Sequence, residues 1–252
     1  MSRGSGPGAA RDFKSKAGAR EWVWDVLAER RVARFPFPPH GRIPNFAGAR
    51  EAAERLFRES PWRDARAIKV NPDSPQAHVR EMALARGIRV YVPTPRLAGG
   101  FHLLDPDRIP PERHREAATL KSMADWSVPV ALREIEALDA IVTGCAAVTS
   151  GGKRAGKGAG YSDLEYAILR ELGFDPVPVA TTVHDAQVVG DFPIEGNDIP
   201  LAVICTPSRT IRVADPPPAP SGVDWNRLRA EDLDAMPVLR ELLAEPERGS
   251  SS

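Results

Sequence analysis

The residue types with the clearest chemical potential are concentrated in a glycine-rich segment, residues 151–163, which reads GGKRAGKGAGYSD. Its alternating glycines permit positive φ and let backbone amides approach a ligand closely. Successive free amides form a concavity that suits phosphate, and a helix that begins directly afterwards adds the positive end of its dipole. Lys153, Arg154 and Lys157 bring cations to the same stretch. The segment is therefore predicted to bind a phosphate group.

A carboxylate closes this segment. Asp163 lies at its end, in the first turn of the helix that is expected to follow. A carboxylate beside a basic loop is a suitable hard-oxygen ligand for the Mg²⁺ that accompanies ATP. The sequence thus predicts ATP and Mg²⁺ as the cofactors.

Three other interpretations of the segment compete with this one. Residues 151–157 fit the start of a Walker A loop, but Gly158 stands where that motif needs Ser or Thr. A dinucleotide fingerprint fails because its third glycine would fall at Tyr161 or Asp163. The third alternative is a solvated surface loop. The order of strand, cations and helix favours a ligand-binding loop instead.

The elements around the loop predict an α/β fold with a mainly parallel sheet flanked by helices. Strands are expected over 65–70, 88–92, 137–144, 180–183, 201–206 and 210–213. Helices are expected over 16–33, 75–86, 112–123 and 162–172, and over about 45–60 with Asn45 as a candidate cap. In such a sheet, ligands bind outside the carboxyl ends of the strands, where residues 151–163 would lie.

Composition limits the remaining possibilities. The 252 residues carry a formal net charge of 0, so a general electrostatic attraction to nucleic acid is not expected. No apolar run reaches the roughly 18 residues that cross a bilayer, and residues 1–11 lack the apolar core of a secretory signal. The two cysteines lie in apolar runs, as buried thiols in a reducing compartment do. We therefore expect a cytoplasmic protein that acts on a small-molecule substrate.

The predicted organisation has four parts. Residues 1–12 are expected to be disordered, and 13–213 to form the ATP-binding domain. Residues 214–223 form a proline-rich linker, and 224–252 a helical C-terminal tail. The tail would either dock on the domain or remain mobile. A monomer or weak homo-oligomer is expected.

The loop also resembles a known family. The pattern Gly152-x-Arg154-x-Gly156-x-Gly158-x-Gly160-Tyr161-x-Asp163 is similar to the G-x-R-L-G-x-G-x-G-Y-Y-D hallmark of 5-formyltetrahydrofolate cyclo-ligases, the methenyltetrahydrofolate synthetases. The resemblance implies a three-layer Rossmann-like fold in which this loop wraps the ATP phosphates and its last aspartate coordinates Mg²⁺.

Two further matches extend the resemblance over about residues 14–206. Lys16 and Arg20 match the family's K-x-x-x-R helix, and Asp198 lies in residues 193–200, which match its P-V-E-x-H-D-x-P segment. The implied catalytic cations are Lys157 and Arg154, and the implied magnesium ligands are Asp163 and Asp198. The implied ATP site comprises Lys16, Arg20, Arg154, Ala155, Gly156, Lys157, Gly158, Ala159, Gly160, Tyr161 and Ser162.

The departures from the family fall mainly on the folate side. Ser162 replaces its second tyrosine, Ala155 its leucine and Gly144 a proline, and residues 69–76 replace an acidic substrate-binding segment. This resembles a divergent paralogue branch, the methenyltetrahydrofolate synthetase domain-containing proteins. The resemblance implies Mg-ATP-dependent conversion of 5-formyltetrahydrofolate to 5,10-methenyltetrahydrofolate. The alternatives are an ATP-dependent enzyme with another substrate, such as a thiamine-related one, and a non-catalytic nucleotide- or folate-binding module.

Polar residues in the loops at strand ends are candidates for the second-substrate pocket, because such loops often carry function. His184 is a further candidate, although a loop histidine is more often structural. The pocket candidates are Arg42, Asn45, Lys69, Asn71, Asp73, Gln76 and Arg96.

Overall fold

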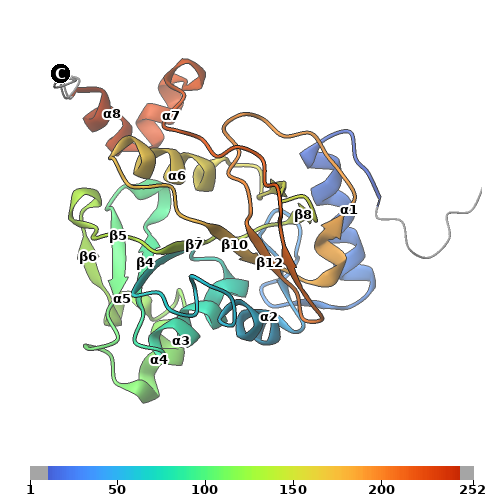
Figure 1. Cartoon of the computed structure of the whole chain (residues 1–252), viewed down its shortest axis with the longest axis horizontal. Coiled ribbons are helices and arrows are strands. Elements are labelled where there is room, and N and C mark those ends of the chain that lie inside the picture. The colour runs from blue at the N-terminus through green and yellow to red at the C-terminus, as the bar shows by residue number, and fades with distance from the viewer. Residues whose placement is uncertain (1–10, 245–252) are drawn as a thin grey trace, which may run out of the picture.

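A mixed eight-stranded sheet crosses the middle of the protein (Figure 1), whose computed structural model describes residues 11–244. The strand order is β13-β12-β10-β7-β3-β4-β5-β6. The five strands from β12 to β4 are parallel, and the edge strands pair antiparallel. The bounds are β3 Ala67–Val70, β4 Arg89–Pro93, β5 Phe101–Leu104, β6 Val128–Val130, β7 Ala140–Val142, β10 Val179–Thr182, β12 Val203–Cys205 and β13 Thr210–Arg212.

The central strands are buried on both faces, as expected for parallel strands covered by helices. One face packs against α2 (Ala49–Leu56), α3 (Ala77–Leu84) and α4 (His114–Ala117). The other packs against α6 (Tyr161–Glu171). Figure 1 shows these helices on opposite sides of the sheet. The predicted α/β, three-layer arrangement is therefore confirmed.

A second, smaller sheet carries the glycine-rich loop. Its order is β11-β8-β9, with β8 at Ala147–Thr149, β9 at Arg154–Ala155 and β11 at Val188–Val189. Helix α1 (Lys16–Glu29) packs against it through Val23 and Leu27. Ser15 caps α1 by accepting a hydrogen bond from the Gly18 amide at 3.1 Å. This packing brings the N-terminal helix beside the loop.

Several predicted elements differ from the structure. The first helix ends at Glu29, because Arg31 adopts a φ of 55° and the chain turns into β1 (Ala33–Arg34). Asn45 caps no helix but lies in β2 (Asn45–Phe46), where its side-chain amide donates to the Phe35 carbonyl. Helix α2 begins later, after Gly48. The helix expected over 112–123 is shorter: a 3-10 turn at Pro111–Arg113 leads into α4, and a separate helix, α5 (Met123–Trp126), begins only at Met123.

The C-terminal segment docks on the domain. After the prolines, α7 (Ala230–Ala235) and α8 (Pro237–Ala244) follow, and Figure 1 places both beside α6. Met236 and Leu239 are fully buried in the cluster that includes the α6 side chains. Of the expected disordered segment 1–12, residues 1–10 lie outside the described part, and the Arg11 carbonyl accepts a hydrogen bond from the Gly190 amide. Residues 245–252 of the expected helical tail also lie outside it.

Between residues 11 and 244, no helix has both the length and the apolar character that a bilayer span requires.

Candidate active site

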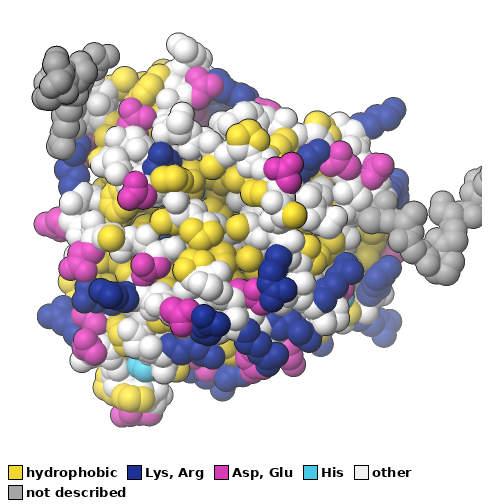
Figure 2. Space-filling view, viewed as in Figure 1, with side chains coloured by type: hydrophobic (Ala, Val, Ile, Leu, Met, Phe, Trp, Pro, Cys, Tyr) yellow, Lys and Arg dark blue, Asp and Glu magenta, His cyan; other side chains and the backbone are white. Residues whose placement is uncertain are grey.

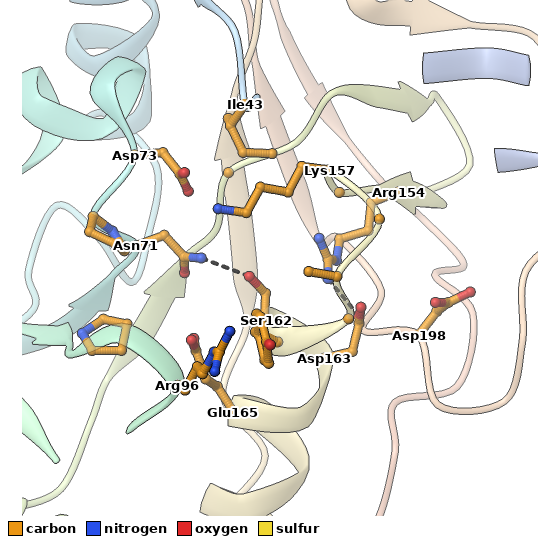
Figure 3. A pocket seen from close by; sticks show the side chains of 18 of the residues that line it. Ile43, Asn71, Asp73, Arg96, Arg154, Lys157, Ser162, Asp163, Glu165 and Asp198 are labelled. Atoms are coloured by element: carbon orange, nitrogen blue, oxygen red, sulfur yellow. Dashed lines mark hydrogen bonds and ion pairs between the residues drawn. The ribbon is translucent and has the colours of Figure 1, made fainter. Parts of the chain in front are cut away.

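A cleft of about 530 Å³ opens where the carboxyl ends of β3, β4 and β7 meet the beginning of α6 (Figure 3). This is the edge of the sheet at which open α/β folds bind ligands. All but one of the site residues named from the sequence line it: Lys16, Arg20, Arg154, Gly156, Lys157, Gly158, Ala159, Gly160, Tyr161, Ser162, Asp163 and Asp198. The fold therefore brings α1, the glycine-rich loop and the 193–200 segment to one place.

Ala155 is the exception. It is fully buried in β9 and packs beneath α1, and its carbonyl accepts a hydrogen bond from the Ala146 amide. Side chains alternate along a strand, so Ala155 points away from the cleft while its neighbour Arg154 points into it. Lys153 also differs from the prediction, because its ammonium pairs with Asp191 at 2.7 Å and does not line the cleft.

Arg154 is a buried cation with unused hydrogen-bonding capacity. Its Nη2 lies 2.6 Å from Oδ1 of Asp163, which also accepts a hydrogen bond from the Ile199 amide. Burial alone would lower the pKa of Arg154, but the adjacent carboxylate of Asp163 raises it above its ordinary value. Its Nε and Nη1 have no hydrogen-bond partner among the described residues. Because unsatisfied buried donors are costly, an anionic ligand would be favoured here.

Two further cations lie at this end of the cleft, Arg20 on α1 and Lys157 within the loop. Arg20 lies against Gly158, where an added Cβ would come within 3.4 Å of the guanidinium and where the backbone φ is 108°. This positive φ favours a glycine at the point where the loop meets Arg20. Arg20 and Lys157 form no hydrogen bond or ion pair with the described residues, and burial lowers the pKa of Arg20. Both charges are available to an anion.

Asp198 is a second carboxylate that lines the cleft. Its two oxygens lie 2.6 and 2.8 Å from the Lys16 ammonium, and Oδ2 accepts a hydrogen bond from the Glu195 amide. Among residues 11–244, no cluster of three or more His, Cys, Asp or Glu side chains could hold a metal ion. Mg²⁺, however, usually takes only one or two carboxylates together with phosphates and water. Asp163 and Asp198 in one cleft suit that mode of binding.

A buried polar chain supports the opposite wall, which Asn71, Ser162 and Glu165 line. The Lys69 ammonium lies 2.5 Å from Oε2 of Glu165 and 2.9 Å from Oδ1 of Asn71. Asn71 in turn donates to Oγ of Ser162 at 2.7 Å, as Figure 3 shows. Ser162 therefore connects the end of β3 to the first turn of α6.

The candidates for the second-substrate pocket separate into two groups. Asn71, Asp73 and Arg96 line the cleft, and the Arg96 guanidinium lies 5.9 Å from the centre of the Tyr161 ring. Lys69, Gln76, Arg42 and Asn45 do not line it.

His184 has a structural role. Its Nδ1 accepts a hydrogen bond from the Ala186 amide, which caps a short 3-10 turn, and its ring packs edge-on to Phe46.

Other lining residues were not anticipated from the sequence. They are Ile43, the turn after β4 at residues 93–95, and Glu165, Glu195 and Asn197. The position of the turn after a parallel strand could have indicated its role. Ile43 could not be placed this way, because it enters from a loop between the two short strands β1 and β2.

The fold and the cleft define an α/β protein with a cationic, carboxylate-bearing ligand site at the switch from sheet to helix. The chain belongs to the 5-formyltetrahydrofolate cyclo-ligase family, whose model matches residues 12–207.

Comparisons with individual proteins are consistent with this family assignment. A methenyltetrahydrofolate synthase domain-containing protein of Bos taurus is 40% identical over 241 residues, which cover 93% of this chain and 63% of that protein. The chain thus spans 63% of the length of that relative. The 5-formyltetrahydrofolate cyclo-ligase of Escherichia coli K12 is 36% identical over 72 residues, covering 29% of this chain and 38% of the enzyme.

A solved structure supports the fold. The 5,10-methenyltetrahydrofolate synthetase of Aquifex aeolicus matches with a TM-score of 0.51 at 16% identity, covering 84% of this chain and 99% of that one. At this identity the likeness shows the fold alone.

Proposed function

We propose that the protein is a Mg-ATP-dependent enzyme of the cyclo-ligase type, which converts 5-formyltetrahydrofolate to 5,10-methenyltetrahydrofolate. The observation that carries the proposal is the set of unsatisfied cationic donors at the beginning of α6. The charges of Arg20 and Lys157, and the free N–H groups of Arg154, lie beside the positive end of a helix. Such a cradle suits a polyphosphate.

In this proposal the protein acts mainly by binding and positioning. The loop amides and Arg20 would hold the phosphates, and Lys157 and Arg154 would offset charge on the transferring phosphoryl group. Asp163 and Asp198 would hold Mg²⁺, which when bound neutralises charge on the phosphate oxygens.

The second substrate would occupy the wall formed by Asn71, Asp73 and Arg96. The γ-phosphoryl group would pass to the formyl oxygen, after which N10 attacks the activated carbon and phosphate leaves. Holding the formyl oxygen in line with the γ-phosphorus would lower the barrier by proximity. This route needs no side-chain nucleophile.

The direct test is to supply 5-formyltetrahydrofolate and Mg-ATP and to follow the absorbance of 5,10-methenyltetrahydrofolate together with ADP release. Formation of both products in equal amounts supports the proposal. Binding of ATP without an absorbance change would refute it.

A second candidate function is supported by the same wall. The family's second tyrosine is replaced by Ser162, which is bonded to Asn71, and a Lys69–Glu165 pair lies behind it. This rebuilt wall suits an ATP-dependent enzyme with a different acceptor. ADP release provoked by one member of a metabolite panel, with none from 5-formyltetrahydrofolate, would favour it over both the cyclo-ligase and a non-catalytic binding module.

Asp163→Asn is expected to raise the Mg²⁺ concentration that gives half-maximal activity by about tenfold, roughly 1.4 kcal/mol. The amide keeps an acceptor for Arg154 and for the Ile199 amide but loses the charge that a hard cation prefers. The measurement is a Mg²⁺ titration at saturating ATP, accompanied by a thermal unfolding midpoint.

The matched control for this titration is Glu195→Gln, which changes a cleft carboxylate whose cationic partner is Arg227. We expect its Mg²⁺ titration to match the wild type. Equal shifts in both variants would argue against Asp163 as a ligand.

A further inference from the structure

One carboxylate in the cleft differs from the others in having no side-chain partner. The Asp73 carboxylate forms no hydrogen bond or ion pair with another described side chain, although it lines the same space. Each remaining acid is paired: Asp163 with Arg154, Asp198 with Lys16, Glu165 with Lys69 and Glu195 with Arg227. Asp73 is therefore available to a ligand.

The Arg80 side chain fixes the backbone on both sides of Asp73. Nη1 of the buried Arg80 donates to the carbonyls of Asn71 and Asp73, at 2.5 and 3.3 Å, and its Nε donates to Ala118. On the other side the carboxylate packs against Gly144, where an added Cβ would come within 2.6 Å of Oδ2. The glycine that replaces the family's proline thus leaves room for this carboxylate.

The surroundings of Asp73 make its carboxylate a stronger proton acceptor than an ordinary aspartate. Burial raises the pKa of the Asp73 carboxyl, and the charges of Lys157, Arg80 and Lys69 only partly oppose this. Burial also lowers the pKa of Arg80 to about 10, which leaves it protonated at neutral pH. A raised pKa brings a carboxylate closer to the range in which a general base is effective.

Asp73 also lies next to the expected site of reaction. Figure 3 shows its carboxylate and the Lys157 ammonium directed into the same part of the cleft, with Asn71 beside them. Lys157 is the cation that we place on the transferring phosphoryl group. A group on the second substrate that lies between this cation and Asn71 would be within reach of Asp73.

We propose that Asp73 is the general base of the ring-closing step, and this rests on the proposed function. The N10 nitrogen forms its bond to the phosphorylated formyl carbon and transfers its proton to an Asp73 carboxylate oxygen. The bond from that carbon to the phosphorylated oxygen then breaks, and phosphate leaves with the bonding electrons. Asp73 finally returns the proton to solvent.

The test compares Asp73→Asn with the wild type across pH, following product formation and ADP release separately. Wild-type kcat should fall as acid protonates Asp73. The asparagine variant should lose this acid limb and run about 10²- to 10⁴-fold slower, the usual contribution of a general base. Its KM for ATP should be unchanged, because Asp73 touches the second substrate.

Two companion variants separate catalysis from structure. Asp191→Asn makes the same chemical change on a carboxylate paired with Lys153 outside the cleft, and it should behave as the wild type. Asp73→Glu retains a displaced base, so part of the rate and the acid limb should return. A merely structural role would give neither.

The outcomes are distinct. Normal product formation by Asp73→Asn, with the acid limb intact, would overturn the assignment of Asp73 and leave the proposed function standing. Absence of product from the wild type itself would overturn both. A slow variant that keeps the wild-type acid limb would also overturn the assignment.

Discussion

Replacing Lys69 with methionine is expected to lower the free energy of unfolding by about 3–5 kcal/mol, which is the usual effect of removing one member of a buried ion pair. The Lys69 and Glu165 side chains are 1% and 7% exposed, and their charged atoms lie 2.5 Å apart. The variant would leave the Glu165 carboxylate buried without its cation. Thermal unfolding should show a midpoint lower by about 6–20 °C for a chain of this size.

The double variant Lys69→Met/Glu165→Leu is the matched control. Removing both charges leaves no uncompensated ion, so most of the lost stability should return, since apolar replacements of buried pairs are often neutral or better. A loss below about 1 kcal/mol in the single variant would contradict the buried-pair interpretation. A double variant as unstable as the single one would instead point to lost packing.

The Lys69 pair also shows why parts of the site could not be predicted from sequence. The run Ala67–Val70 is recognisable as a strand, and it is one. Nothing in it indicates that its lysine is buried, because the compensating carboxylate lies 96 residues further along the chain. Charges rarely become buried without partners, and only the tertiary fold reveals which partner is present.

The glycine-rich loop gives the complementary case. Its position after a strand and before a helix, its cations and its terminal aspartate could all be read from local order. The directions of the Ala155 and Lys153 side chains could not be predicted. A two-residue strand, β9, interrupts the loop there, and successive side chains of a strand point to opposite faces. A two-residue strand is too short to show a recognisable sequence pattern, and β9 is defined by its pairing with β8.

The strands at one edge of the main sheet, β5 and β6, were not predicted from the sequence. Strands β5 and β6 are short, and β6 contains Pro129, which sequence rules exclude from a central strand. At an edge, however, a missing amide donor has little cost. These strands extend the sheet beside β4, whose last residue leads into the cleft-lining turn at residues 93–95.

Lys157→Ala is expected to weaken ATP binding by about 1.5–3 kcal/mol, the range for hydrogen bonds that involve a charged group. This corresponds to roughly a 10- to 140-fold rise in Kd. Lys157 forms no hydrogen bond or ion pair with the described residues, so its removal should cost little stability. Calorimetric titration with a non-hydrolysable ATP analogue and Mg²⁺ measures the change.

The same loop offers a control lysine whose side chain has the same chemistry but points away from the cleft. Lys153 lies four residues earlier, and its ammonium pairs with Asp191 outside the cleft. Lys153→Ala removes an equal charge from the same segment, so a merely electrostatic effect of the loop on a polyphosphate would weaken binding similarly in both variants. We expect only Lys157→Ala to weaken it appreciably. Equal losses would mean that the loop attracts ATP by its net charge, without the defined contact that the direction of Lys157 predicts.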